Sequence, residues 1–174
     1  MIETERLLHR KFTLEDLSKL IELRFDDEVI KYLGGRRLQN PESIEKRLHF
    51  YLDCYEKYNF GMCALIWKPT GEMIGWSGLQ PLDETGETEV GYGMIKEFWG
   101  KGIGSETAKG WLEYAFTVAN LGKIVAVASP ENTASWRIME NVGMRREKIE
   151  TYYGMECVFY SITKDEFANQ KKID

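Results

Sequence analysis

The sequence predicts an α/β fold: one domain over residues 1–174, with a mixed, largely antiparallel central sheet and helices on both of its faces. Three observations lead to this prediction. The chain has 174 residues, a length that suits one domain with a sizeable core. Hydrophobic residues make up 43% of it, which excludes a disordered chain. Segments of helical period alternate with segments typical of strands, in the order β-α-α-β-β-β-α-β-α-β-β.

The first elements are a strand and two helices. The strand is expected over Arg6 to Phe12, and Thr13 caps a helix that ends near Phe25, with an acidic residue three positions after the cap. A second helix starts at Asn40-Pro41, because proline fits the first helical position.

The hydrophobic period then changes, and three strands follow with turn residues between them. Pro69-Thr70-Gly71 forms the first turn, and the polar, Gly-containing segment Asp83 to Glu87 forms the second. The predicted strands span residues 60–68, 72–82 and 88–95.

The second half of the chain contains the longest predicted helix, residues 104–120. A continuous apolar strand at 123–128 is of the kind buried on both faces. A helix over 132–142 stops at Gly143, which suits a left-handed C-terminal cap. Two further strands close the chain at 144–150 and 156–163.

Charge and composition exclude several classes of protein. Lys and Arg number 23 and Asp and Glu 28, so the net charge is 23 − 28 = −5. This acidity argues against nucleic acid as a partner and is compatible with a cationic substrate. Three scattered cysteines and two histidines predict no disulfide framework and no metal site. No apolar segment is long enough for a leader or a membrane span, so a cytoplasmic protein is expected.

The glycine-rich segment Trp99 to Ser105 lies between a predicted strand and the longest helix, where backbone N–H groups and the helix N-terminus favour an anion. A Walker loop fails because Lys101 is followed by glycine. A dinucleotide fingerprint fails because the glycine spacing is G-x-G-x-G and no βαβ unit begins there. A pyrophosphate cradle for coenzyme A and a turn without any ligand both remain open.

A family resemblance becomes specific at this point. The run from Glu89 to Gly104, then Asn132-x-x-Ser135 and Asn141-Val-Gly-Met144, resembles the GNAT superfamily of acyl-CoA-dependent N-acetyltransferases. The opening Glu3 to Leu8 is similar to the first strand of its ribosomal-protein amino-terminal acetyltransferase branch. Each motif is weak alone, but the ordered set covers essentially the whole chain. The resemblance implies the GNAT fold and acetyl-CoA as cosubstrate, without a metal.

The resemblance also implies which residues bind coenzyme A. Gly102 and Gly104 match the small positions of the loop whose amides hold the pyrophosphate, while Trp99 departs from the usual Gln or Arg. Asn132 matches the residue that bonds the pantetheine arm, although an N-cap role alone would also explain it. The implied cofactor-binding set is Met94, Ile95, Gly100, Lys101, Gly102, Ile103, Gly104, Ser105 and Asn132.

Two residues are implied as catalytic. Many members of the superfamily protonate the departing thiolate with a tyrosine, but this chain has Met139 at that position. In the branch it resembles, a serine takes over, and Ser135 matches it, although a plain first-turn serine is the alternative. Glu89 matches the family carboxylate and is expected to accept the amine proton, directly or through water. Its alternative is an exposed strand carboxylate.

The implied activity is direct attack of a primary amine on acetyl-CoA in a ternary complex. The resemblance makes a protein amino terminus the first expected acceptor. A lysine amine costs roughly 4.6 kcal/mol to deprotonate at pH 7 and an α-amine only roughly 1.4 kcal/mol, and a base must cover this cost. A polyamine, an aminoglycoside or another small amine is the alternative acceptor. A non-catalytic acyl-CoA-binding module and, more distantly, a Rossmann-like nucleotide binder are the other classes. Segment 26–40 is expected to cover the acceptor, and the chain to be a monomer or homodimer.

Overall fold

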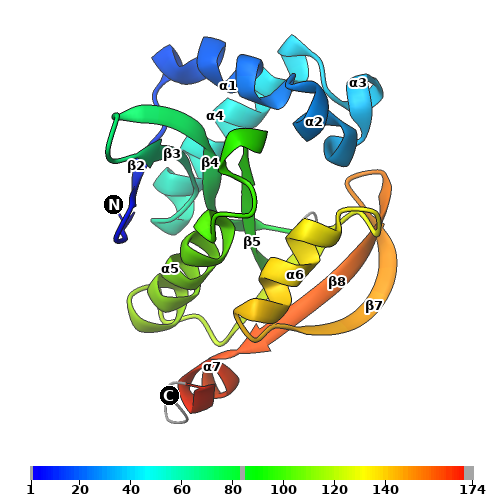
Figure 1. The fold of residues 1–174 in the computed structure, drawn as a ribbon. Coiled ribbons are helices and arrows are strands. Elements are labelled where there is room, and N and C mark those ends of the chain that lie inside the picture. The colour runs from blue at the N-terminus through cyan, green and yellow to red at the C-terminus, as the bar shows by residue number, and fades with distance from the viewer. Residues whose placement is uncertain (1, 83–84, 171–174) are drawn as a thin grey trace.

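A computed structural model describes residues 2–82 and 85–170 around one eight-stranded sheet (Figure 1). The strand order is β1-β2-β3-β4-β5-β6-β8-β7, and every neighbouring pair is antiparallel except β5 and β6. The strands are β1 (Ile2–Glu3), β2 (Leu7–Lys11), β3 (Met62–Trp67), β4 (Glu72–Pro81), β5 (Thr88–Met94), β6 (Lys123–Ala128), β7 (Arg145–Tyr152) and β8 (Met155–Thr163).

The main helices are α1 (Leu17–Arg24), α4 (Pro41–Tyr58), α5 (Ile103–Thr117) and α6 (Thr133–Asn141). Figure 1 shows α5 and α6 in front of the sheet and α1 and α4 behind its upper part. The mixed, largely antiparallel sheet with helices on both faces is therefore confirmed. Shorter helical segments are η1 (Leu14–Asp16), α2 (Asp27–Ile30), η2 (Lys31–Leu33), α3 (Gly35–Leu38), η3 (Lys96–Phe98) and α7 (Lys164–Gln170).

The termini of the elements follow local sequence signals. Asp16 Oδ2 accepts from the Thr13 backbone N–H at 2.8 Å, although the first turn is 3₁₀, and the α-helix begins at residue 17. Asn40 Oδ1 accepts from the Ser43 N–H at 2.9 Å, and Pro41 opens α4 as expected. Gly143 has φ +82°, the left-handed conformation predicted after α6.

The sequence missed the smallest elements. α2, α3 and β1 span four residues or fewer, too short for a hydrophobic period to show. α7 has a single buried residue, Phe167, so it also lacks an apolar stripe. Asp83 and Glu84 of the predicted polar turn lie outside the described residues.

The core lies on both faces of the sheet. Along β3, Cys63 packs with the residues of α5 on one side, and Ala64 packs with those of α1 and α4 on the other. β6 is buried on both faces, as its apolar sequence predicted: Ile124 and Val125 belong to different clusters. Cys157 is buried as well, as expected for a small core residue.

The parallel pair β5 and β6 positions the site. Its register consists of one pair, Glu89 with Val125, whereas β5 pairs with β4 along its whole length. Beyond Glu89 the two parallel strands therefore separate, and α6 begins beyond the end of β6. The backbone of β5 from residue 91 onward faces this opening.

A buried polar cluster under β2 makes stability depend on pH. His9 is fully buried; its Nδ1 lies 2.7 Å from Ser77 Oγ and accepts from Trp111 Nε1 at 3.2 Å. Burial lowers the pKa of His9 to about 4, from 6.5. Between these values the unfolded chain binds a proton that the folded chain does not, so stability falls as the pH falls.

We therefore expect the free energy of unfolding to drop by up to about 3 kcal/mol through His9 alone between pH 6.5 and 4. Urea unfolding at several pH values measures it. His9→Gln should remove this part of the slope, whereas His49→Gln, at the exposed second histidine, should retain it. An identical slope in wild type and His9→Gln would contradict the assignment.

Among the described residues, no helix combines the length and the apolar character needed to cross a bilayer.

Candidate active site

A groove of about 470 Å³ follows the opening between β5 and α6 and ends at the first turn of α5. Met94 of β5 lines one part of it, and the glycine-rich segment from Trp99 to Ser105 lines another. Among the described residues, the backbone N–H groups of 100–105 donate to no protein acceptor. Six consecutive free donors at a helix N-terminus form a cradle suited to a pyrophosphate.

Glycine is required at particular points of this loop. Gly100 and Gly102 have φ +71° and +76°, which side chains rarely adopt, and this turns successive amides toward the groove. A Cβ on Gly104 would lie 2.3 Å from Ile138 of α6, so the small residue lets α5 and α6 approach each other beside the groove. The loop therefore fits the predicted anion-binding role better than a plain turn.

The sequence-predicted loop residues divide by how they meet the groove. Gly100, Gly102, Gly104 and Ser105 line it, together with Met94 and Asn132. Ile103 is 1% exposed and packs in the core, so it can contribute only its backbone. Ile95 packs against the α1–α4 side, and its N–H and carbonyl already bond the Ile74 carbonyl and the Phe98 N–H, so the structure does not support its predicted role. The Lys101 side chain does not line the groove: its ammonium lies 5.6 Å from the centre of the Phe98 ring.

Hydrogen bonds and an ion pair connect the start of α5 to the N-terminal segment. Glu106 accepts from Thr4 Oγ1 at 2.6 Å and from Arg6 Nε at 2.7 Å, and Arg6 Nη1 donates to the Lys101 carbonyl at 3.0 Å. Burial alone would raise the pKa of Glu106, but the hydrogen bonds from Thr4 and Arg6 hold it below its ordinary value. The N-terminal residues Thr4 and Arg6 thus hold the glycine-rich loop at Lys101 and the first turn of α5.

Trp99, the departure from the family pattern, connects the end of β5 with segment 26–40. Its indole Nε1 donates to the Met94 carbonyl at 2.8 Å, which closes the turn between β5 and α5. Its ring lies 6.3 Å from that of Tyr32 in η2, so it also contacts segment 26–40. Lys96 of η3 reaches the same segment through a 3.2 Å ion pair with Glu28.

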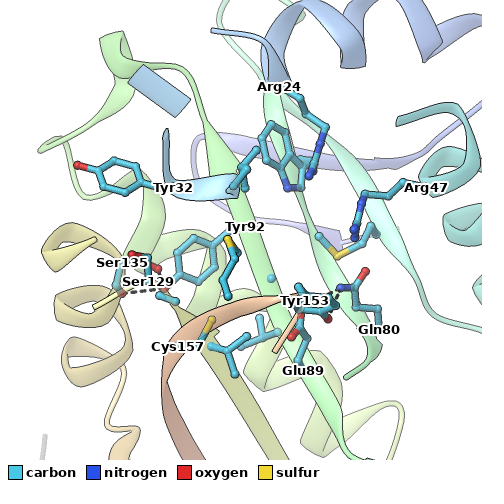
Figure 2. Close-up of a pocket in the computed structure, with 18 of the residues that line it drawn as sticks. Arg24, Tyr32, Arg47, Gln80, Glu89, Tyr92, Ser129, Ser135, Tyr153 and Cys157 are labelled. Carbon is cyan, nitrogen blue, oxygen red and sulfur yellow. Dashed lines mark hydrogen bonds between the residues drawn. The ribbon is translucent and has the colours of Figure 1, made fainter. Parts of the chain in front are cut away.

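A second cavity of about 270 Å³ lies on the other side of β5 (Figure 2). Five residues line both this cavity and the groove: Tyr32, Leu33, Trp76, Tyr92 and Ser135. The Tyr92 hydroxyl donates to the Ser135 carbonyl at 3.0 Å, and Ser135 Oγ lies 3.5 Å from it. Asn132 caps α6 by accepting from the Ser135 N–H at 3.2 Å. Two hydroxyl groups therefore stand where the two spaces meet.

The sequence did not single out Tyr92. The sequence shows that Tyr92 lies two residues before Met94. It does not show which face of β5 the side chain occupies, because this depends on the pairing of Tyr92 with Ser77 of β4. Burial raises the pKa of the Tyr92 phenol well above its ordinary value. Tyr92 therefore stays protonated at neutral pH and can donate a hydrogen bond. Met139, at the position where the resemblance led us to expect a tyrosine, is buried and lines the second cavity.

Glu89 lies at the far end of the second cavity. It is 5% exposed, so the alternative of an exposed strand carboxylate is wrong. Gln80 of β4, opposite in the register, donates Nε2 to Glu89 Oε1 at 2.7 Å and lies 3.1 Å from the Tyr153 hydroxyl. Of the described residues that line this cavity, Glu89 is the one carboxylate. Glu87, two positions earlier, instead pairs with Lys123 at 2.8 Å.

Segment 26–40 roofs the second cavity. Tyr32, Leu33 and Leu38 reach its lining from this segment, and Tyr153 and Met155 reach it from the turn between β7 and β8. Figure 1 shows this turn rising toward α2 and α3. Gly34 and Gly35 have positive φ and form the turn into α3, so their occurrence is explained by local geometry. Motion of the segment stays a prediction.

The described residues contain no cluster of three or more metal-ligating side chains. The parallel strand pair that separates over an amide-rich loop, with a cavity on the other side of the strand, is the arrangement expected of an acyl-CoA-dependent transferase.

Comparison with known proteins agrees with this class. The family described as Acetyltransferase (GNAT) domain matches residues 6–145. The uncharacterized N-acetyltransferase p20 of Bacillus licheniformis is 31% identical over 172 residues, covering 95% of this chain and 97% of that protein. The chain therefore belongs to the GNAT acetyltransferase family.

Solved structures agree as well. A GNAT-family acetyltransferase from Bacillus anthracis is 27% identical with a TM-score of 0.77, covering 94% of this chain and 98% of that one. The aminoglycoside acetyltransferase AAC(6')-Ib in complex with coenzyme A has a TM-score of 0.78 at 19% identity, covering 95% and 99%. The second likeness shows the fold alone.

Proposed function

We propose that this GNAT acetyltransferase transfers the acetyl group of acetyl-CoA to an α-amine by direct attack, with Glu89 as the base and Ser135 and Tyr92 as donors to the leaving sulfur. The observation that carries the proposal is the meeting of the two spaces at Tyr92 and Ser135. A thioester in the groove and an amine in the cavity would face each other there.

The loop and the strand hold the cosubstrate. The amides of residues 100–105 bind its pyrophosphate, and the separated edge of β5 near Met94 pairs with the pantetheine arm. Ile95 takes no part in this pairing, because its N–H donates to the Ile74 carbonyl and its carbonyl accepts from the Phe98 N–H. Asn132 lines the groove while capping α6, so its two roles coexist. These assignments are supported by the free amide donors and the glycine geometry described above.

Glu89 removes a proton from the attacking amine. Glu89 and Tyr92 occupy opposite faces of β5 because side chains alternate along a strand, so the transfer runs through water. The freed amine nitrogen forms a bond to the acyl carbon, the carbon–sulfur bond breaks, and the sulfur keeps the electron pair as a thiolate. Ser135 and Tyr92 turn their hydroxyl protons from their present acceptors, the Tyr92 oxygen and the Ser135 carbonyl, toward the sulfur and stabilise this charge as it develops. The nitrogen loses its second proton as the amide forms, and the thiolate takes up this proton to give the free thiol of coenzyme A.

An α-amine suits this base best. Its deprotonation at pH 7 costs about 3 kcal/mol less than that of a lysine side chain, and Glu89 is the one lining carboxylate described. A protein amino terminus remains the first acceptor, and a small amine the second. A non-catalytic acyl-CoA-binding module is disfavoured because Tyr92 supplies the phenol that Met139 cannot.

Removing the two hydroxyl groups should slow the reaction without weakening cosubstrate binding. We expect Ser135→Ala and Tyr92→Phe each to lower kcat by about tenfold, which corresponds to one neutral hydrogen bond, and the double variant to lose more. Release of free thiol from acetyl-CoA with a panel of α-amines measures the rate. A thermal-shift titration measures acetyl-CoA binding.

Tyr114→Phe is the matched control, because the Tyr114 hydroxyl bonds the Asn59 carbonyl far from the groove. Wild-type rates in the double variant would exclude the two hydroxyls from the reaction. Stabilisation by acetyl-CoA without turnover on any amine would favour the binding module instead.

A further inference from the structure

The cavity on the acceptor side of β5 contains more cationic than anionic groups. Among its described lining residues, Arg24 and Arg47 are the cations and Glu89 is the one carboxylate. Figure 2 shows both guanidinium groups entering from the side of helices α1 and α4, with Glu89 at the opposite end. This excess runs against the chain as a whole, whose net charge is −5.

Arg24, the last residue of α1, is a buried cation without a counter-ion. It is 4% exposed, and no described carboxylate lies within ion-pair distance of it. Its Nε and Nη2 both donate to Gln39 Oε1, at 3.1 and 3.0 Å. Burial lowers its pKa to about 10, so it is still charged at neutral pH. A buried charge paired only with an amide oxygen is costly.

The surroundings of Arg24 fix its direction. The guanidinium carbon lies 4.7 Å from the centre of the Trp76 ring, and Gln39 is itself anchored by donating to the Leu33 carbonyl at 3.0 Å. Gly93 leaves the space for the indole, because a Cβ there would lie 2.3 Å from the Trp76 ring. The planar group is thus held in one orientation at the cavity wall.

Trp76 places this cation next to the reaction centre. It lines both the groove and the cavity, as Tyr92 and Ser135 do. Arg24 is therefore one side chain away from the place where amine and thioester would meet. Arg47 of α4 lies further along the cavity, with its guanidinium carbon 5.8 Å from the centre of the Tyr153 ring. Unlike Arg24, it is already stabilised by neighbours: its interaction and hydrogen bond with Tyr51 and the attraction of Tyr153 and Glu89 raise its pKa.

We propose that the acceptor is a primary amine whose own molecule has a carboxylate or phosphate within a few bonds of the amine, and that Arg24 and Arg47 bind this anion. The inference rests on the proposed function and narrows its acceptor. A guanidinium presents parallel N–H donors that match either oxyanion. An arriving anion would supply the counter-charge that Arg24 lacks.

The same charges select against polycations. A polyamine or an aminoglycoside would bring several ammonium groups against two guanidinium groups in a confined space, where like charges repel strongly. These small amines, an alternative from the sequence, are therefore the poorer acceptors. An amino acid, an aminoalkyl phosphate and a peptide with an acidic first residue share the required chemistry.

Matched pairs of amines test the proposal, because the members of a pair share a carbon skeleton and differ in the anion. Since the anion also raises the pKa of the amine, kcat/KM is compared per unprotonated amine. The pairs are an α-amino acid and its amide, 2-aminoethyl phosphate and 2-aminoethanol, and a peptide beginning with Asp and one beginning with Asn. Thiol release from acetyl-CoA gives kcat/KM for each amine. We expect at least a tenfold preference for the anionic member in one or more pairs, and the pair showing it identifies the source.

The variants Arg24→Gln and Arg47→Gln should each remove most of this preference through KM. Rates with the neutral members should change much less, which a merely structural role of Arg24 would not produce. Arg24→Lys should restore part of the preference. Arg146→Gln, an exposed arginine on β7, is the control. Because Arg24→Gln could destabilise the fold, the half-buried Arg47 provides an independent variant, and thermal unfolding is recorded for both.

Binding separates the inference from the proposed function. The thermal midpoint with coenzyme A present is measured with each pair. Equal rates and equal shifts within all three pairs would overturn the anion site, even if amines are acetylated. Selective shifts with the anionic members that Arg24→Gln removes would support the site, even if no amine is acetylated and the proposed activity fails.

Discussion

Replacing Glu89 with glutamine should lower kcat/KM by about 10²- to 10⁴-fold, the usual contribution of a general base. The substitution is nearly isosteric, and Gln80 can still donate to the side-chain oxygen at position 89, which it now meets at 2.7 Å. The fold and the affinity for acetyl-CoA should therefore be retained. Turnover with an α-amine at several pH values is the measurement.

The pH dependence distinguishes a base from a structural residue. As the pH approaches the pKa of the acceptor amine, the free amine forms without help, so the deficit of Glu89→Gln should shrink. Glu87→Gln is the matched control, because Glu87 belongs to a surface ion pair with Lys123 and lines neither space. A deficit that stays constant over the whole pH range would contradict the role of Glu89.

Replacing Gly75 with alanine should destabilise the protein by about 3 kcal/mol or more. Gly75 faces Met94 in the β4–β5 register, and a Cβ there would lie 2.1 Å from the Gly93 carbonyl oxygen. Because the obstacle is backbone, no side chain can rotate away, and the strand that borders both spaces must move. The free energy of unfolding from urea titration measures the loss.

Gly93→Ala provides a graded comparison if Gly75→Ala does not fold. Its Cβ would meet the Trp76 ring, which is able to shift, so a loss of about 1–3 kcal/mol is expected. Gly122→Ala is the control, because a Cβ there has open space and the backbone is not left-handed. A Gly75→Ala protein as stable as Gly122→Ala would show that the strands do not approach as closely as described.

The cosubstrate side of the site was largely predictable from the sequence. A strand, a glycine-rich turn and a helix follow one another directly, so the loop from Trp99 to Ser105 is a local feature whose geometry depends on its own residues. The same holds for Asn132 and Ser135, since an N-cap and its first turn are encoded within four residues. The resemblance to the GNAT superfamily then connected these local features to acetyl-CoA.

The acceptor side could not be predicted in the same way. Arg24 ends α1, Arg47 lies within α4, and Tyr153 follows β7, so they converge only when the helices pack on the sheet. In the sequence, Arg24 and Arg47 follow the polar pattern of surface helices and give no sign of the cavity. Tyr92 was equally hidden, because a shift of register by one residue would move it to the other face.

The sequence by itself determined the order of the main elements, the mixed sheet and the glycine-rich loop at the start of α5. These depend on hydrophobic period, caps and turns, which act over a few residues. The tertiary structure alone decided that Glu89 is buried, that Tyr92 meets Ser135, and that Arg24 has no carboxylate beside it among the described residues. Burial and electrostatic pairing are properties of groups brought together from distant segments, so no local pattern encodes them.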